Sequence, residues 1–140
     1  MKQTLLAAVF AISVAANAQA ASPGCPPAGY DRARLDALGA AHWEIADDAA
    51  RNALARAMVA CLADPDTAYR DGLAFEAFQH WMRADQLNHE TVLAIGDELQ
   101  SWLTAPEGAG YSRPFAALIL AEVARTDRIH PWLTADRRAS

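Results

Sequence analysis

Lysine and β-branched residues are scarce in this chain. Its 12 basic residues include a single lysine, Lys2, and they are outnumbered by 17 Asp and Glu, which gives a formal net charge of −5. Residues 21–140 contain only three Val, four Ile and five Thr. Because strands favour these residues and helices favour the abundant alanine, we predict an all-α fold. The acidic balance argues against nucleic acid as a partner.

Sequence motifs that carry catalytic or metal chemistry are also missing. The chain contains no Cys-x-x-Cys pair, no His-x-x-x-His or His-Glu-x-x-His run and no Gly-x-Ser-x-Gly elbow. These absences argue against thioredoxin-like chemistry, a helix-borne zinc site and a serine-hydrolase nucleophile. The run 108–110 lacks the lysine of a phosphate loop and is interpreted as a turn. We therefore expect no metal and no cofactor, and we lean towards a protein that is not an enzyme.

Histidines and paired carboxylates receive structural interpretations. His80 and His89 straddle a predicted helix turn with Asp85 between them, and we interpret them as surface histidines rather than metal ligands. Three carboxylate pairs lie at predicted helix starts or on exposed faces, where the helix dipole or water favours them. These pairs are Asp47 with Asp48, Asp64 with Asp66, and Asp97 with Glu98.

The first 20 residues have the pattern of a secretory signal peptide. Lys2 precedes the apolar run 5–16, and small residues at Ala18 and Ala20 predict cleavage between Ala20 and Ala21. The run is shorter than the roughly 20 residues of a membrane-spanning helix. We expect an exported mature chain, periplasmic or secreted, with no stable membrane span once the signal is removed.

Cys25 and Cys61 are the two cysteines of the chain. An even count in an exported protein predicts a disulfide, which would attach the proline-rich tail 21–30 to the helical domain. The alternative is that Cys61 is a buried free thiol and that Cys25 has no structural role.

Residues 31–140 are predicted to form one α-helical domain of about five helices. Asp47 and Asn88 are suitable N-caps, Pro65 or Asp66 opens the third helix, and Thr134 begins a further helix near the end of the sequence. The predicted helices cover 31–40, 47–62, 65–83 and 88–103, with a fifth helix starting at Ser112. The tryptophans are expected to anchor helices to one another, at Trp43, Trp81, Trp102 and Trp132.

The fifth predicted helix is unusually apolar. From Phe115 to Ala124 its only polar residue is Glu122. A helix that is apolar on nearly all sides is normally buried on nearly all sides. We therefore expect neighbouring elements to enclose Leu118, Ile119 and Leu120.

Short helices that recur every 35–45 residues or so suggest stacked antiparallel hairpins, as in a HEAT-like α-solenoid. The run 64–66, Asp-Pro-Asp, followed by Arg70, is typical of such repeats: the arginine bonds back to the acidic turn.

Two stretches resemble a bacterial domain-of-unknown-function family, family 2785. The first is RDGLAF at 70–75 followed by Trp81, and the second is YSRPFAALIL at 111–120, followed by RTD at 125–127 and PWLT at 131–134. The resemblance covers roughly 47–138 and implies an α-helical repeat fold, with no activity assigned.

This chain departs from the family pattern in two places. Members tend to have a second serine where this chain has Pro114. They also continue beyond the PWLT stretch into a further helical half with its own His-containing motif. We therefore expect a truncated or naturally half-length form, and any activity of the missing half would be absent.

Arg70, Asp71 and Arg113 are the polar residues of these motifs with a candidate functional role. They would either line a groove for an anionic or peptide ligand or hold turns together, and we prefer the structural role.

The main functional hypothesis is an exported helical-repeat module that binds a protein or peptide of the cell envelope, or that self-associates through the fifth helix. The alternative is a hydrolase-type enzyme, or its N-terminal half, with Arg70, Asp71 and Arg113 near the site. A truncated product without an independent role is the third interpretation.

Overall fold

The computed structural model describes residues 24–108 and 110–139. The predicted signal peptide 1–20 and the cleavage between Ala20 and Ala21 lie outside these described residues. Within them the secondary structure is helical and contains no strand, which confirms the all-α prediction. No helix in this part of the chain combines the length and the apolarity needed to cross a bilayer.

Six helices follow one another along the described chain if contiguous segments are joined. The second is α2 with its 3-10 extension η1, and the third joins α3, a π-helical segment η2 and α4. The bounds are α1 Arg32–Ala40, α2 Asp48–Met58, η1 Val59–Ala63, α3 Thr67–Tyr69, η2 Arg70–Phe75, α4 Glu76–Arg83, α5 His89–Thr104, α6 Ser112–Ile129 and α7 Ala135–Ala139. About five helices were expected, and α7 adds the short sixth one at the predicted Thr134 start.

Side-chain caps begin the helices where the sequence indicates. The Asp47 carboxylate accepts a hydrogen bond from the Ala50 N–H at 2.8 Å, and the Asn88 side chain accepts one from the Thr91 N–H at 2.7 Å. Asp66 caps the third helix. These bonds satisfy N–H groups that the first turn of a helix leaves without partners.

The π-helical segment η2 interrupts a helix that was predicted to be regular. It contains Gly72, which has open space where a Cβ would be. Glycine weakens an α-helix by about 1 kcal/mol relative to alanine, so a local change of helical winding costs little here. Such segments are rare, and the amphipathic pattern of the sequence does not reveal them.

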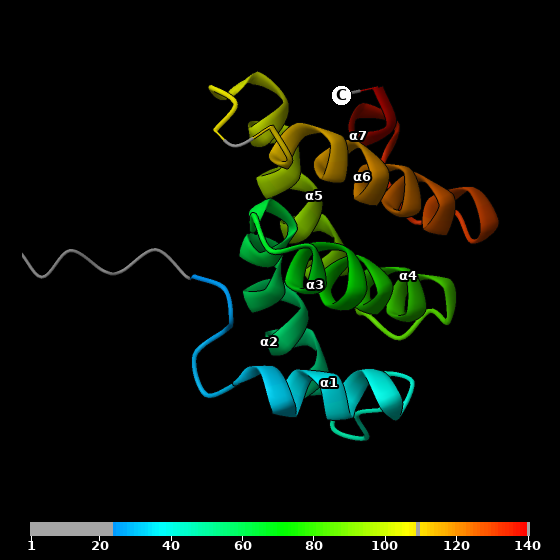
Figure 1. Ribbon diagram of the computed structural model, residues 1–140. Coiled ribbons are helices and arrows are strands. Elements are labelled where there is room, and N and C mark those ends of the chain that lie inside the picture. Colours follow the sequence, from blue (N-terminus) through cyan, green and yellow to red (C-terminus); the bar gives the residue numbers. More distant parts are fainter. Residues whose placement is uncertain (1–23, 109, 140) are drawn as a thin grey trace, which may run out of the picture.

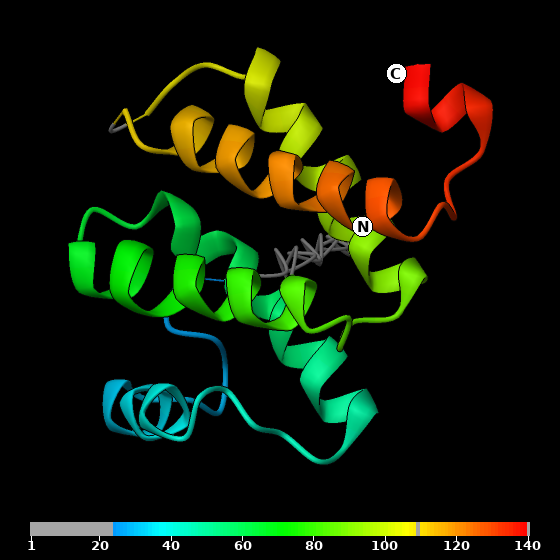
Figure 2. The ribbon, with the colours of Figure 1, turned by 90° about the vertical axis from the view of Figure 1, so that its right-hand side faces the viewer.

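The helices lie in two layers. Figures 1 and 2 show α1, the α3–α4 helix and α6 following one another on one side, with α2 and α5 crossing behind them. Contacts join α5 to α6, α4 to α6 and α2 to α5. The core between the layers is built around Trp81, Phe78 and Met58, which are fully enclosed. The Trp81 indole N–H donates to the Trp43 carbonyl at 3.0 Å, so these two tryptophans act as the expected anchors.

Cys25 and Cys61 form a disulfide, with their Cα atoms 4.9 Å apart. The bond joins the tail before α1 to the buried end of the α2–η1 helix. The predicted pairing is therefore confirmed, and the free-thiol alternative is wrong.

The expectation that α6 is enclosed on nearly all sides is wrong. Ile119 is fully buried and Leu120 is half-buried, but Leu118 is 47% exposed. Glu122, the one polar residue of the apolar stretch, is instead buried. Its Oε1 accepts a hydrogen bond from the Arg83 Nε of α4 at 3.0 Å, and this charged partner compensates the burial. The inward face of α6 was therefore set by its neighbours rather than by hydrophobicity alone.

We predict that Cys25→Ser lowers the free energy of unfolding by about 4 kcal/mol, the chain-entropy value for a loop of this size. Urea unfolding followed by tryptophan fluorescence measures the loss. Reduction with dithiothreitol should lower the wild-type midpoint to that of the variant and leave the variant unchanged. Equal stability of the wild-type protein with and without reductant would contradict the prediction.

Candidate functional site

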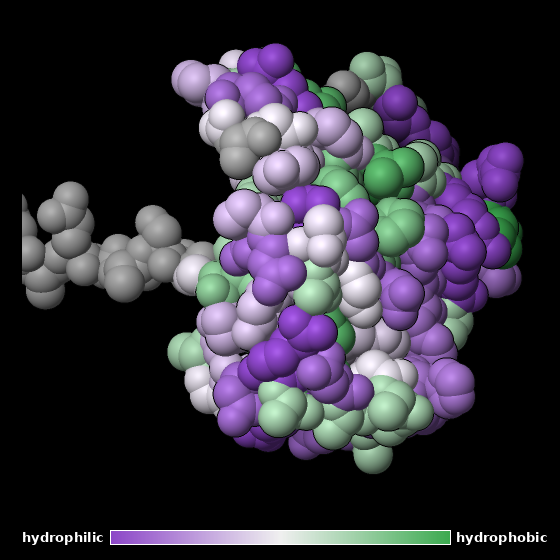
Figure 3. Space-filling view, viewed as in Figure 1, coloured by the Kyte–Doolittle hydropathy of each residue, from purple (hydrophilic) through white to green (hydrophobic). Residues whose placement is uncertain are grey.

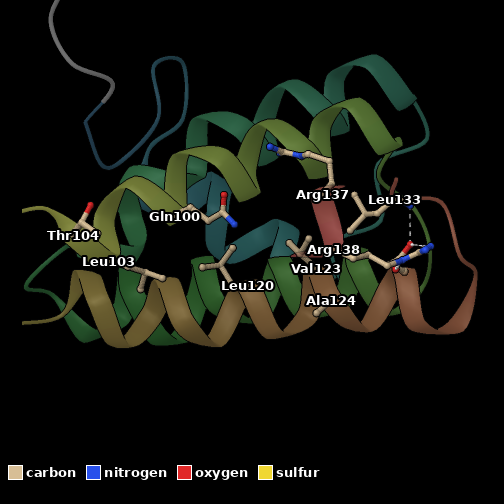
Figure 4. Close-up of a pocket in the computed structure, with 10 residues that line it drawn as sticks. Gln100, Leu103, Thr104, Leu120, Val123, Ala124, Leu133, Arg137 and Arg138 are labelled. Carbon is tan, nitrogen blue, oxygen red and sulfur yellow. Dashed lines mark hydrogen bonds and ion pairs between the residues drawn. The ribbon is translucent and has the colours of Figure 1, made fainter. Parts of the chain in front are cut away.

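A groove of about 580 Å³ runs between α5, α6 and α7. Figure 4 shows Gln100 and Leu103 of α5 and Leu120 and Val123 of α6 pointing into the space between the two helices. Leu103 is 42% exposed and lines the groove together with other apolar side chains. Leu133, between α6 and α7, extends this apolar lining. The groove therefore offers apolar surface to an incoming molecule.

Short helix α7 occupies one end of this groove and is held there by polar contacts. None of its residues is buried. Arg137 pairs with Asp97 of α5, and the Arg138 Nε donates to Asp127 Oδ2 at 2.6 Å. The Thr134 hydroxyl accepts a hydrogen bond from the Arg137 N–H at 3.3 Å. Thr134 therefore caps α7, and the helix starts where the sequence predicts.

Asp127 is the connection point between α6 and the segment that follows. Its Oδ1 accepts hydrogen bonds from the backbone N–H groups of Leu133 at 2.7 Å and Trp132 at 2.8 Å. The Arg138 guanidinium and these two amides hold the pKa of the Asp127 carboxyl well below its usual range.

Trp132 attaches the same segment to α5 and α6. Its ring stacks on His89, the first residue of α5, with ring centroids 4.3 Å apart and planes 9° from parallel. Its indole N–H donates to the Thr126 hydroxyl at 3.2 Å. His89 therefore has a packing role. Among the described residues no group of three or more His, Cys, Asp or Glu side chains is placed to hold a metal ion.

The motif residue Arg70 is buried, with 6% of its surface exposed. Its guanidinium donates to the Asp64 carbonyl at 3.0 Å, pairs with Asp71 at 2.8 Å and lies 4.0 Å from the Tyr111 ring centroid. These contacts tie the turn before α3 to the start of α6. The bond to the Asp64 carbonyl is the contact back to the acidic turn that was expected of Arg70.

Arg113 lies in the same region but closes a different loop. Its Nη2 donates to the Ala105 carbonyl at 2.6 Å, and its Nε lies 3.2 Å from Glu107. The Ser112 hydroxyl, together with Arg113, lowers the pKa of Glu107. Arg70, Asp71 and Arg113 are thus gathered around the first turns of α6, and their contacts hold the chain together there.

Comparison with known proteins produced no match: no family model, no curated protein and no solved structure is similar to this chain. The resemblance to family 2785 therefore stays a prediction.

No pattern in the sequence indicates the groove. Leu103 is the last residue of the predicted helix 88–103, and Arg137 and Arg138 follow the predicted helix start at Thr134. The available signal was the cluster of arginines after 124, but only the folded chain shows that two of them, Arg137 and Arg138, line the same groove as Leu103 and Leu120.

We predict that Arg70→Ala lowers the free energy of unfolding by about 2–3 kcal/mol, because hydrogen bonds of a buried charged group and its ring contacts are lost. Arg70→Lys should recover part of the loss, since it keeps the charge without the planar fork. Arg113→Ala is the control, with a smaller effect because the side chain is exposed. Urea unfolding distinguishes the three, and an unchanged midpoint for Arg70→Ala would exclude the structural role.

Acid should weaken the attachment of α7. Because the pKa of Asp127 is lower in the folded state than in the unfolded chain, its stabilising contribution is present above about pH 4 and disappears as the pH falls further. Asp127→Asn should therefore be less stable than wild type at pH 7, with a difference that shrinks below pH 4. Thermal melts across pH measure this. Arg138→Gln should lose part of the same pH dependence. A stability difference between Asp127→Asn and wild type that stays constant across pH would contradict the role given to the Asp127 carboxylate.

Proposed function

We propose that this chain is an exported, non-enzymatic helical-repeat module that binds an amphipathic helix of a cell-envelope protein in the α5–α6–α7 groove. The exposed apolar lining of that groove is the observation that carries the proposal. Concave sites lined mainly by apolar side chains with a few polar groups at the edge are the usual form of a binding site.

The shape and position of the groove support a helix as its occupant. The groove lies between α5 and α6 (Figure 4), whereas α4 packs against a different side of α6, as the ribbon in Figure 1 shows. Side chains spaced by four residues, such as Leu120 and Ala124, form a ridge against which another helix packs. In a HEAT-like stack this is where the next helix would lie, and a partner helix supplies the same contacts.

The disulfide supports export, because disulfides persist in oxidising compartments. The signal-peptide pattern of 1–20 also supports export.

The hydrolase alternative has no comparable support. Arg70 is buried under Tyr111, and the Arg113 guanidinium is bound to the Ala105 carbonyl and Glu107. A site built on these residues would need them to leave contacts that hold α6 in place.

We expect the purified chain to bind at least one member of a panel of synthetic 18-residue amphipathic helices that share a leucine face and differ in their polar face. Leu103→Glu should weaken that binding about tenfold, because a charge enters the apolar contact. Fluorescence anisotropy measures the affinity.

Leu118→Glu is the matched control, since Leu118 is similarly exposed but lies outside the groove lining. It should bind like wild type. Failure of every peptide, or equal losses in both variants, would contradict the proposal. Light scattering tests self-association, which would appear as a concentration-dependent dimer.

A further inference from the structure

Charge is distributed unevenly along the chain. Residues 112–139 carry five arginines and three carboxylates, whereas the whole chain has more Asp and Glu than Lys and Arg. The basic segment is the one that forms α6 and α7, which border the groove. Such local asymmetry indicates a partner of opposite sign.

The carboxylates around the groove are mostly neutralised by arginines. The ion pairs are Asp97 with Arg137, Asp127 with Arg138, Glu122 with Arg83 and Glu107 with Arg113. Asp136 is exposed in the first turn of α7, where the helix dipole favours it. The side chains of Arg125 and Arg128 make no hydrogen bond or ion pair within 24–108 and 110–139. The carboxylate that lines the same hollow, Glu122, is buried and paired with Arg83, so the two guanidinium groups can pair with a partner.

Arg128 continues the row that borders the groove. Leu120, Ala124 and Arg128 are spaced by four residues and therefore share one face of α6. Arg125 and Arg128 also line a second hollow of about 390 Å³, which shares Ala124 with the groove. Figure 3 shows apolar surface over α6 with hydrophilic surface beside it.

We propose that the helix bound in the groove is acidic: its leucine-type face contacts Leu103 and Leu120, and carboxylates on its flank pair with Arg128 and Arg125. This inference rests on the proposed function and specifies its partner. A second copy of this chain fits less well, because its own arginine-rich α6 edge would place like charges together.

The test compares two peptides from the panel that have the same leucine face, one with glutamate and one with lysine on the polar face. Wild type should bind the glutamate peptide at least tenfold more tightly at low salt, and the preference should shrink as salt screens the charges. The double variant Arg125→Glu/Arg128→Glu should reverse the preference. Arg56→Glu reverses the charge of an exposed arginine of α2, away from α6, and is the control that should retain the preference.

The following outcomes would overturn this inference. Equal binding of both peptides, or a lysine preference, would leave a helix-binding groove without selection for acid. No binding of any peptide would remove the proposed function itself. Arginine-dependent binding of phosphatidylglycerol vesicles in place of the peptides would assign the surface to a membrane.

Discussion

The structure depends on how α6 is covered. This helix carries apolar residues around most of its circumference, yet α4 and α5 pack against only part of it. Ile119 and Ala116 are fully buried at those contacts, while Leu118 remains in solvent. Leu120 and Val123, on another side of the helix, form one wall of the groove. The helix that completes the core therefore also borders the groove.

Polar contacts decide how α6 is oriented and how its two ends are attached. At its first turns, the Arg70 guanidinium lies against Tyr111 and bonds to the turn before α3. In its middle, Glu122 faces α4 and is held by Arg83. At its end, Asp127 binds the backbone of the following segment and Arg138. Each contact gives a partner to a buried charge that would be costly if left alone.

Much of the architecture followed from local rules. The caps Asp47, Asp66 and Asn88 lie where short polar side chains precede apolar periodicity, and scarce β-branched residues exclude a sheet in the described chain. The face of α6 was harder to predict. Leu118 and Glu122 have opposite hydrophobicity and lie one turn apart, and their burial is the reverse of what hydrophobicity alone indicates. The partner that makes this possible, Arg83, is 39 residues away.

The sequence by itself determined the helical class, the helix starts and the cysteine pairing, because these depend on residues near one another in the chain or on a single available partner. Tertiary structure alone decided which side of α6 is covered, where Arg70 is buried and how Leu103 and Leu120 come to border one groove. Those outcomes depend on contacts between segments distant in sequence. A local sequence pattern does not show which segment packs against a helix or which face of the helix stays exposed.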